Sequence, residues 1–305
     1  MINPKPSGTT SSAIRVVELQ SATQRLQVLP TLGGSIAAWD WKLKEQWSPL
    51  LRSWDGTSKD RYAMACFPLV PWSNRITDGG FTHQGRHYPV LENRAGEPYP
   101  IHGDAWLQKW RVANRTPNSI QLTLKSDCFD GNPHSYRCSQ TLTLTDDGLS
   151  IALLVTHLGA ESLPYGLGLH PYFPRNEATR FSSRADGVWL SDSDQIPTAH
   201  TKAFPQTWNY NHPAALEGPL IDNCFTGWDG KALISYPDRG LELSVTMDNC
   251  SSYSLMYRPP KHDYFCFEPI THPINAFHVT GKPGLVTLAR GQTLSMKTHF
   301  QVSVM

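Results

Sequence analysis

Glu268 is the most informative candidate for chemistry in this sequence, because its neighbours are apolar. The aromatic run from Tyr264 to Phe267 precedes it, and Pro269 and Ile270 follow it. A buried carboxylate without partners is costly to ionise, so we expect Glu268 to be paired or to have a raised pKa. Such a carboxylate has the profile of a general base. The alternative is a structural glutamate on the polar face of an edge strand, which Pro269 would permit.

Other polar residues also interrupt apolar or turn-forming sequence. His170 ends a segment of Gly and Leu before a proline, and His102 lies between Ile and Gly. Asn74 and Arg75 follow a proline-framed segment, and Asp222 stands beside apolar residues. Each residue alone also has a structural interpretation, as a hydrogen-bonded core histidine, a surface cation or part of an Asp-Asn turn.

The pair His83 and His87 invites consideration as metal ligands. That spacing brings two side chains together on a helix, whereas the Gln-Gly-Arg between them predicts a turn between strands. No third or fourth ligand stands nearby, and the sequence has neither a C-x-x-C pair nor a Gly-rich nucleotide loop. The sequence therefore predicts no metal site and no cofactor.

The composition argues against several classes of partner. The 305 residues include 27 basic and 26 acidic side chains, for a net charge of +1, so no overall field favours nucleic acid or anionic lipid. No apolar run approaches the roughly 20 residues that span a bilayer. The 10 Trp, 11 Tyr and 11 Phe are mostly ordinary core and surface residues, yet such rings also pack against the apolar faces of sugars.

Cysteine usage and the N-terminus predict a cytoplasmic protein. The six cysteines are scattered, and a chain of 305 residues needs no disulfides for stability, so we expect reduced thiols. The stretch from Met1 to Glu18 lacks the apolar segment of a secretory signal. Either a monomer or a homodimer is compatible with the sequence.

Alternation of apolar and polar residues with period two predicts an all-β fold. Residues 136–145 alternate, 146–148 supply turn chemistry, and 149–158 form the returning strand. A second hairpin is expected over residues 231–247, with its turn at 237–240. Further strands are predicted at 25–30, 35–41, 120–126 and 285–288.

Short strands with turns throughout indicate one domain, residues 1–305, built as a large antiparallel β-sandwich. No linker composition divides the chain. Residues 185–219 lack periodicity and are rich in Asp, Pro, Asn and Trp, which predicts a long loop with a functional role.

Five blocks of sequence resemble the aldose 1-epimerase (galactose mutarotase) family, in the family's order and from about Leu29 to Phe300. The blocks are Asn74-Arg75-Ile76 followed by Gly80-Phe81, Gly85 and Tyr88; Asn93 with His102-Gly103; His170-Pro171-Tyr172-Phe173; Asp222 before Cys224-Phe225; and Glu268-Pro269. The resemblance implies a galactose mutarotase-like supersandwich with an open cleft on one face. Where the family has a second Gly after His-Gly, this chain has Asp104 and then Trp106.

The resemblance also implies roles. Glu268 matches the family's general base, and His170 matches its general acid. The residues that match groups binding the sugar hydroxyls and ring oxygen are Arg75, His102 and Asp222, and Asn74 in the same motif is a further expected sugar ligand.

The implied reaction exchanges the α and β anomers of a free aldose, so the expected partner is a monosaccharide. Ring opening needs a base at the anomeric hydroxyl and an acid at the ring oxygen. We therefore expect an ionised Glu268 and a protonated His170, whose pKa nearby carboxylates would raise. The alternatives are a mutarotase of phosphorylated hexoses, a sugar-binding protein without turnover, and a glycosidase with Asp222 and Glu268 as its carboxylate pair.

Overall fold

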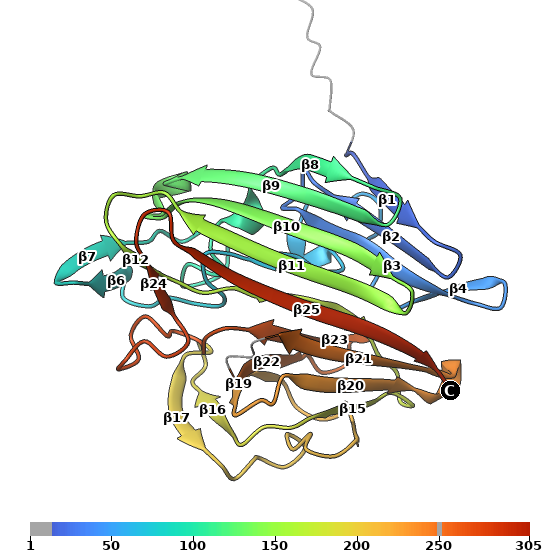
Figure 1. The fold of residues 1–305 in the computed structure, drawn as a ribbon. Coiled ribbons are helices and arrows are strands. Elements are labelled where there is room, and N and C mark those ends of the chain that lie inside the picture. Colours follow the sequence, from blue (N-terminus) through green and yellow to red (C-terminus); the bar gives the residue numbers. More distant parts are fainter. Residues whose placement is uncertain (1–13, 249–251) are drawn as a thin grey trace, which may run out of the picture.

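The computed structural model describes residues 14–248 and 252–305. Cys250 lies outside these residues. So does most of the N-terminal stretch on which the prediction of no secretory signal is based. The regular secondary structure of the described residues is nearly all strand, in antiparallel sheets joined by turns, loops and short 3-10 helices (Figure 1). This architecture confirms the predicted all-β sandwich.

One large sheet has nine strands and contains both predicted hairpins. In the order in which they pair, its strands are β18 (Ala214–Ala215), β15 (Arg180–Ser183), β20 (Lys231–Tyr236), β21 (Leu241–Asp248), β25 (Thr293–Val304), β11 (Gly148–His157), β10 (Ser135–Thr145), β9 (Ser119–Asp127) and β8 (Arg111–Arg115). The C-terminal strand β25 lies in the middle of this sheet, between β21 and β11 (Figure 1).

The other large sheet has eight strands and carries most of the candidate site. In pairing order its strands are β17 (Pro197–Thr201), β16 (Gly187–Ser191), β19 (Ile221–Thr226), β22 (Tyr253–Arg258), β23 (Tyr264–Ile270), β13 (Gly168–Leu169) and β5 (Pro68–Leu69), and β14 (Tyr172–Pro174) also pairs with β23.

Smaller elements complete the described chain. A four-stranded sheet consists of β1 (Val17–Gln20), β2 (Gln24–Leu29), β3 (Ser35–Leu43) and β4 (Gln46–Pro49). Two further pairs are β12 (Leu163–Tyr165) with β24 (Val286–Leu288), and β6 (Gly80–His83) with β7 (Arg86–Pro89). The 3-10 helices are η1 (Arg61–Ala63), η2 (Ala105–Leu107), η3 (Phe129–Gly131) and η4 (Pro237–Arg239).

The strand predictions are confirmed, with their ends shifted by at most one or two residues. In β10 the alternating residues Tyr136, Cys138, Leu142 and Leu144, with Gln140 on the same face, are at most 3% exposed, whereas the residues on the opposite face lie nearer the surface. The second hairpin turns through η4, and β6 and β7 form the turn expected between His83 and His87.

The prediction of a long loop over residues 185–219 is wrong. β16 and β17 form a hairpin at the edge of the eight-stranded sheet, and β18 pairs with β15. The pairing of β16 with β17 shifts register between Leu190 and Ser191, and most of β17 is exposed. A register shift combined with exposure removes the period-two signal from the sequence.

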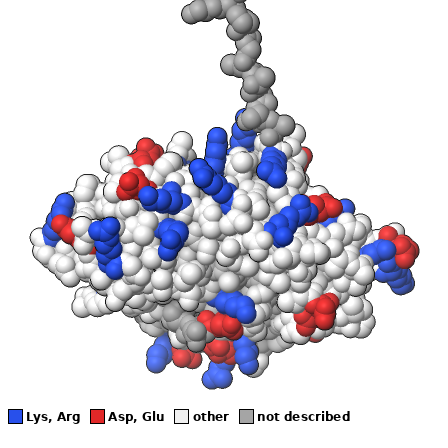
Figure 2. Space-filling view, turned by 45° about the horizontal axis from the view of Figure 1, so that its top comes forward, with Lys and Arg blue, Asp and Glu red and all other residues white. Residues whose placement is uncertain are grey.

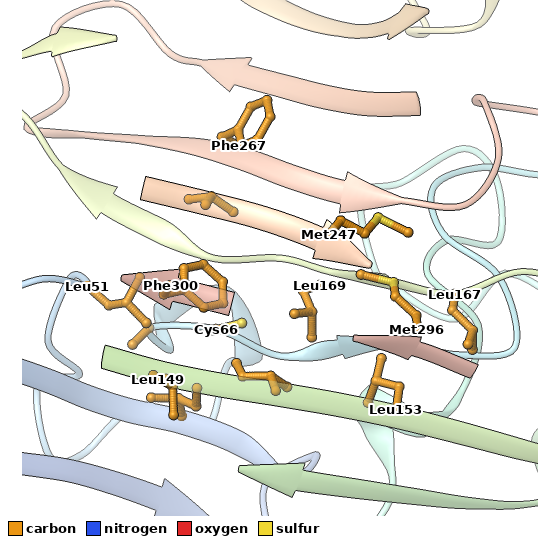
Figure 3. Close-up of a cluster of buried hydrophobic side chains, with 14 of the residues drawn as sticks. Leu51, Cys66, Leu149, Leu153, Leu167, Leu169, Met247, Phe267, Met296 and Phe300 are labelled. Carbon is orange, nitrogen blue, oxygen red and sulfur yellow. The ribbon is translucent and has the colours of Figure 1, made fainter. Parts of the chain in front are cut away.

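The hydrophobic core lies where the sheets face each other, and it is filled by side chains from strands of both large sheets (Figure 3). Phe300 on β25 connects three sheets. Its ring centroid lies 6.1 Å from that of Trp39 on β3 and 6.3 Å from that of Phe173 on β14. Aromatic pairs at this separation contribute beyond the area they bury. Packing around Phe300 therefore holds the eight-stranded sheet in place against the rest of the molecule.

The surface carries charges of both signs. Figure 2 shows basic and acidic side chains interspersed over one face, as a net charge of +1 predicts. Among the residues that the structure describes, no helix is long and apolar enough to cross a membrane.

We predict that Phe300→Ala destabilises the protein by about 3–5 kcal/mol, because it opens a cavity between the sheets. Val304→Ala is the matched control: it lies on the same strand, but Val304 is 63% exposed, and surface substitutions change stability by about 0.5 kcal/mol or less. Urea unfolding followed by tryptophan fluorescence measures both. Equal losses in the two variants would contradict the packing role of Phe300.

Candidate functional site

A cavity of about 250 Å³ opens over the eight-stranded sheet, and all of the predicted site residues line it. This volume lies just below the range of about 300–1,000 Å³ that is typical of pockets for drug-sized molecules, and suits a single sugar unit. The lining residues are Tyr62, Asn74, Arg75, Glu97, Ile101, His102, His170, Tyr172, Asp222, Tyr257, Tyr264 and Glu268.

Strand register places two acidic residues of the cavity, Asp222 and Glu268, on one face of the sheet. Asp222 on β19 lies opposite Tyr257 on β22, which lies opposite Cys266 on β23. Glu268 is two residues beyond Cys266, so its side chain points to the same face. β23 lies between β22 and β13 in the interior of the sheet. The alternative of an edge-strand glutamate is therefore wrong.

The other site residues come from the ends of strands and the connections between them. His170 directly follows β13, and Asn74 and Arg75 follow β5. His102 precedes η2, in a segment where Arg75 and Ile101 form an isolated β-bridge. Residues far apart in the sequence thus meet over the middle of the sheet.

His170 and Glu268 form a close pair of ionisable groups deep in the cavity. Nε2 of His170 lies 3.3 Å from Oε1 of Glu268, and the side chains are 7% and 2% exposed. The imidazole is stacked between Phe67 and Tyr172, with ring centroids at 4.7 and 4.8 Å. The aromatic rings fix the imidazole so that one nitrogen faces the carboxyl group.

Burial decides where the proton of this pair resides. It lowers the pKa of His170 to about 3, and the positive charges of Arg52 and Arg94 act in the same direction. Burial also raises the pKa of Glu268 well above its ordinary value, as does Asp222, whereas Arg75 opposes the change. The expectation that carboxylates raise the pKa of His170 is therefore wrong. Both shifts favour the neutral form of the pair, with its proton on Glu268.

His102 and Asn74 hold each other through two hydrogen bonds. The backbone N–H of Asn74 donates to Nδ1 of His102 at 3.0 Å, and the backbone N–H of His102 donates to the carbonyl of Asn74 at 3.0 Å. Burial lowers the pKa of His102 well below its ordinary value, with His170 and Arg75 adding to the effect. A neutral His102 with Nδ1 accepting carries its proton on Nε2, and so can donate a hydrogen bond.

Arg75 is the central cation of the cavity. Its guanidinium lies 3.1 Å from Oε2 of Glu97 and 3.5 Å from Oδ2 of Asp222, and NH1 donates to Oδ1 of Asn74 at 3.4 Å. Burial acts to lower the pKa of Arg75, but the two carboxylates outweigh it and the net change is upward. Burial raises the pKa of Asp222, and Arg75 opposes this.

Sequence reasoning missed Glu97 and most of the tyrosines of the cavity. Glu97 lies in a connection without periodicity, so no pattern marks it. Tyr62, Tyr172, Tyr257 and Tyr264 all line the cavity. The abundance of aromatic residues suggested sugar-binding rings in general, but only the fold separates these four from core aromatics.

Two arginines pack on these rings. The guanidinium carbon of Arg94 lies 3.7 Å from the centre of the Tyr62 ring. That of Arg52 lies 3.9 Å from the Tyr172 ring and 4.4 Å from the Tyr264 ring. These cation–π contacts stiffen the aromatic part of the cavity wall.

Asp104, where the sequence departs from the family pattern, faces away from the cavity. Its carboxyl group accepts hydrogen bonds from Tyr136, from Asn132 at 2.9 Å and from Ser126 at 3.3 Å. Burial raises its pKa to about 7, although these donors oppose the change. Asp104 therefore fastens the segment after His102 to β9 and β10.

The structure also bears on metal binding. In residues 14–248 and 252–305, no three His, Cys, Asp or Glu side chains are grouped so that they could hold a metal ion.

Comparison with solved structures shows the class to which this architecture belongs. The chain is similar to a candidate aldose 1-epimerase from Escherichia coli K12, with 30% identity, a TM-score of 0.89 and coverage of 95% of this chain and 99% of that one. It is similar in fold to a galactose mutarotase-like protein from Clostridium acetobutylicum, with 20% identity, a TM-score of 0.82 and coverage of 95% of each chain. The fold is galactose mutarotase-like, as the resemblance predicts.

Sequence comparison narrows this class to a family. The family model of aldose 1-epimerase matches residues 15–301. The Escherichia coli K12 protein YphB is 33% identical over 264 residues, which cover 84% of this chain and 89% of YphB. The chain belongs to the aldose 1-epimerase family.

Gly103 generates a prediction about how the site is held. Its φ is +66°, and a Cβ added there would lie 2.1 Å from the carbonyl oxygen of Val70. We predict that Gly103→Ala destabilises the protein by about 2–5 kcal/mol, since backbone strain and overpacking add.

Gly85→Ala is the matched control, because Gly85 has a φ of +77° with no heavy atom within 4 Å of the added Cβ. This variant should lose only about 1–2 kcal/mol of stability, because the alanine is strained in the left-handed conformation but meets no neighbouring atom. Urea unfolding compares the two variants, and an equal loss would show that the contact with Val70 imposes no constraint.

Proposed function

We propose that this protein is an aldose 1-epimerase that interconverts the α and β anomers of a free monosaccharide. The proposal depends above all on the 3.3 Å contact between His170 and Glu268 in the cavity. An acid and a base side by side, in a pocket the size of one sugar unit, suit a reaction that moves protons only. Family membership supports an isomerase of this type.

The proposed reaction opens and closes the hemiacetal. Glu268, as carboxylate, takes the proton of the anomeric hydroxyl, while His170, as imidazolium, gives its proton to the ring oxygen. The C1–O5 bond breaks as the C1 carbonyl forms, the C1–C2 bond rotates, and closure on the other face returns both protons. Positioned acid and base catalysis contributes about 10²–10⁴-fold for each group.

The reactive form of the pair carries the same number of protons as the resting form. The two pKa shifts favour a resting pair with its proton on Glu268, and transfer across the 3.3 Å contact would place that proton on His170. No proton has to enter from water, so the pair is best treated as one titrating unit.

The remaining polar groups would orient the sugar. Arg75, the Nε2–H of His102 and the amide nitrogen of Asn74 can donate to sugar oxygens, while Asp222 can accept from hydroxyl groups. Because Arg75 already contacts Asp222, these groups form a fixed frame around the pair. Holding the sugar in one orientation is itself a source of rate enhancement.

The other interpretations fit the cavity less well. A phosphorylated hexose needs unpaired cations, but Arg75 is paired with Glu97 and Asp222, and Arg94 with Asp60. A glycosidase needs two carboxyl groups at the scissile bond, whereas Asp222 is engaged by Arg75 and Glu268 faces an imidazole. A binding protein without turnover has no need of the buried acid–base pair.

We predict that Glu268→Gln lowers kcat for mutarotation by 10²-fold or more while sugar binding persists, because the amide keeps its shape but accepts no proton. Polarimetry on freshly dissolved α-D-glucose and α-D-galactose measures kcat, and calorimetry measures binding. Glu161→Gln is a control, since Glu161 is exposed and pairs with Arg86 outside the cavity. Activity above about a tenth of wild type in Glu268→Gln would exclude Glu268 as the base.

The pH dependence of kcat/KM provides a second test. A second proton on the pair stops the reaction, and since the pKa of His170 is lowered to about 3 by burial, the acid limb should lie far below the ordinary imidazole value of about 6.5. Loss of the single proton gives the alkaline limb, which the raised pKa of Glu268 shifts upward. We expect polarimetric rates to show no acid-limb inflection near pH 6.5.

His170→Asn is the companion variant. It should lower the rate by about 10²-fold or more, because the acid is lost. A wild-type inflection near pH 6.5 that disappears in His170→Asn would show instead that His170 titrates as an ordinary imidazole.

A further inference from the structure

Glu97 extends the cavity beyond the residues that the sequence blocks mark. Both Nε and NH2 of Arg75 contact its Oε2, at 3.2 and 3.1 Å. Its other oxygen, Oε1, has no hydrogen-bond partner among the described residues, and the side chain is 19% exposed. Glu97 therefore offers one free acceptor atom at the wall of the cavity.

The segment that carries Glu97 is anchored at both ends. The Asn93 side chain donates to the carbonyls of Ile101 and Gly103 at 2.8 Å, and its oxygen accepts from the N–H of Ile101 at 2.9 Å. Arg94 pairs with Asp60 at 2.9 Å. A carboxylate on so constrained a segment is preorganised, so it can accept a hydrogen bond without further ordering.

Glu97 also completes the charge balance of the cavity. The lining sets the carboxylates of Glu97 and Asp222 against the single guanidinium of Arg75. Burial favours the neutral forms of Glu268 and of both histidines, because it raises the pKa of the acid and lowers those of the imidazoles. Arg52, close to the cavity wall, donates to the carbonyl of Met64 at 3.0 Å and packs on Tyr172. The guanidinium groups of Arg75 and Arg52 therefore already have partners within the protein. An anionic ligand in the cavity would be repelled by carboxylates instead of being bound by a free cation.

We propose that Glu97 is a specificity-determining residue that restricts the site to sugars without an anionic substituent. Its Oε1 accepts a hydrogen bond from a hydroxyl of the sugar, and its Oε2 keeps Arg75 from binding a carboxylate or phosphate of the ligand. Like charges in a pocket of low dielectric repel strongly, so the discrimination falls on hexuronates and hexose phosphates. This inference is built on the proposed function and names its substrate class.

The test compares wild type with Glu97→Gln on galactose, galacturonate and galactose 6-phosphate, with anomer exchange measured by NMR. In wild type, kcat/KM for either anion should be at least about 100-fold below that for galactose, a difference of about 2.7 kcal/mol. In Glu97→Gln that ratio should narrow by about tenfold or more, through a lower KM for the anions. KM for galactose should rise a few-fold with kcat nearly unchanged.

Two further variants control the test. Glu161→Gln removes an exposed carboxylate that is likewise paired with an arginine, and should leave the ratio unchanged. Glu97→Asp keeps the charge and should retain most of the discrimination. Thermal unfolding confirms that each variant is folded. If Glu97→Gln does not fold, the inference is tested by the ratio of kcat/KM for galactose to that for the anionic sugars in wild type.

The inference and the proposed function fail in different ways. Equal turnover of galactose and galacturonate by wild type, or an unchanged ratio in Glu97→Gln, would overturn the role of Glu97 and leave mutarotation intact. Absence of turnover with every sugar would overturn the proposed function. In that case the role of Glu97 is tested by calorimetric binding of the same sugars. If wild type does not bind galactose more tightly than galacturonate, the role of Glu97 is also overturned.

Discussion

The candidate site is organised around one buried contact, between the carboxyl group of Glu268 and the imidazole of His170. A carboxyl group and an imidazole that share a cavity sheltered from water are most stable when both are neutral, and this sets the state of Glu268 and His170. Ionising the pair in place costs desolvation, which hydrogen bonds to a bound sugar would offset. Arg75 and Asp222, which contact each other, act on the carboxyl group in opposite directions: Asp222 raises the pKa of Glu268 and Arg75 lowers it.

This arrangement requires a rigid scaffold around the site. The sheet fixes Glu268 and Asp222 by register, while His102 and Asn74, both with positive φ, are fixed by hydrogen bonds to each other. Non-glycine residues in this conformation cost energy, and they persist where the surroundings determine the backbone completely. Asp104 and Gly103 supply part of those surroundings, which gives the departure from the family pattern a structural role.

The sequence predicts the fold and the polar centre of the site well, but its boundary poorly. Strands such as β10 are read correctly because one face is buried along their whole length. The hairpin of β16 and β17 is missed because a register shift and exposure erase the alternation. Glu97 and Tyr62 carry no local signal, since only tertiary contacts bring them to Arg75 and Arg94. The protonation of His170 is mispredicted because burial outweighs the nearby carboxylates.

The position of β25 has a consequence for how the protein reaches this state. The strand that is synthesised after all the others closes the nine-stranded sheet between β21 and β11. Until it arrives, both neighbours present unpaired backbone edges, and the packing around Phe300 that joins the sheets is missing. The nascent chain is therefore exposed to edge-to-edge association until β25 has been made. A ribosome that stops short of β25 would release a polypeptide prone to self-association, with every residue of the candidate site already made.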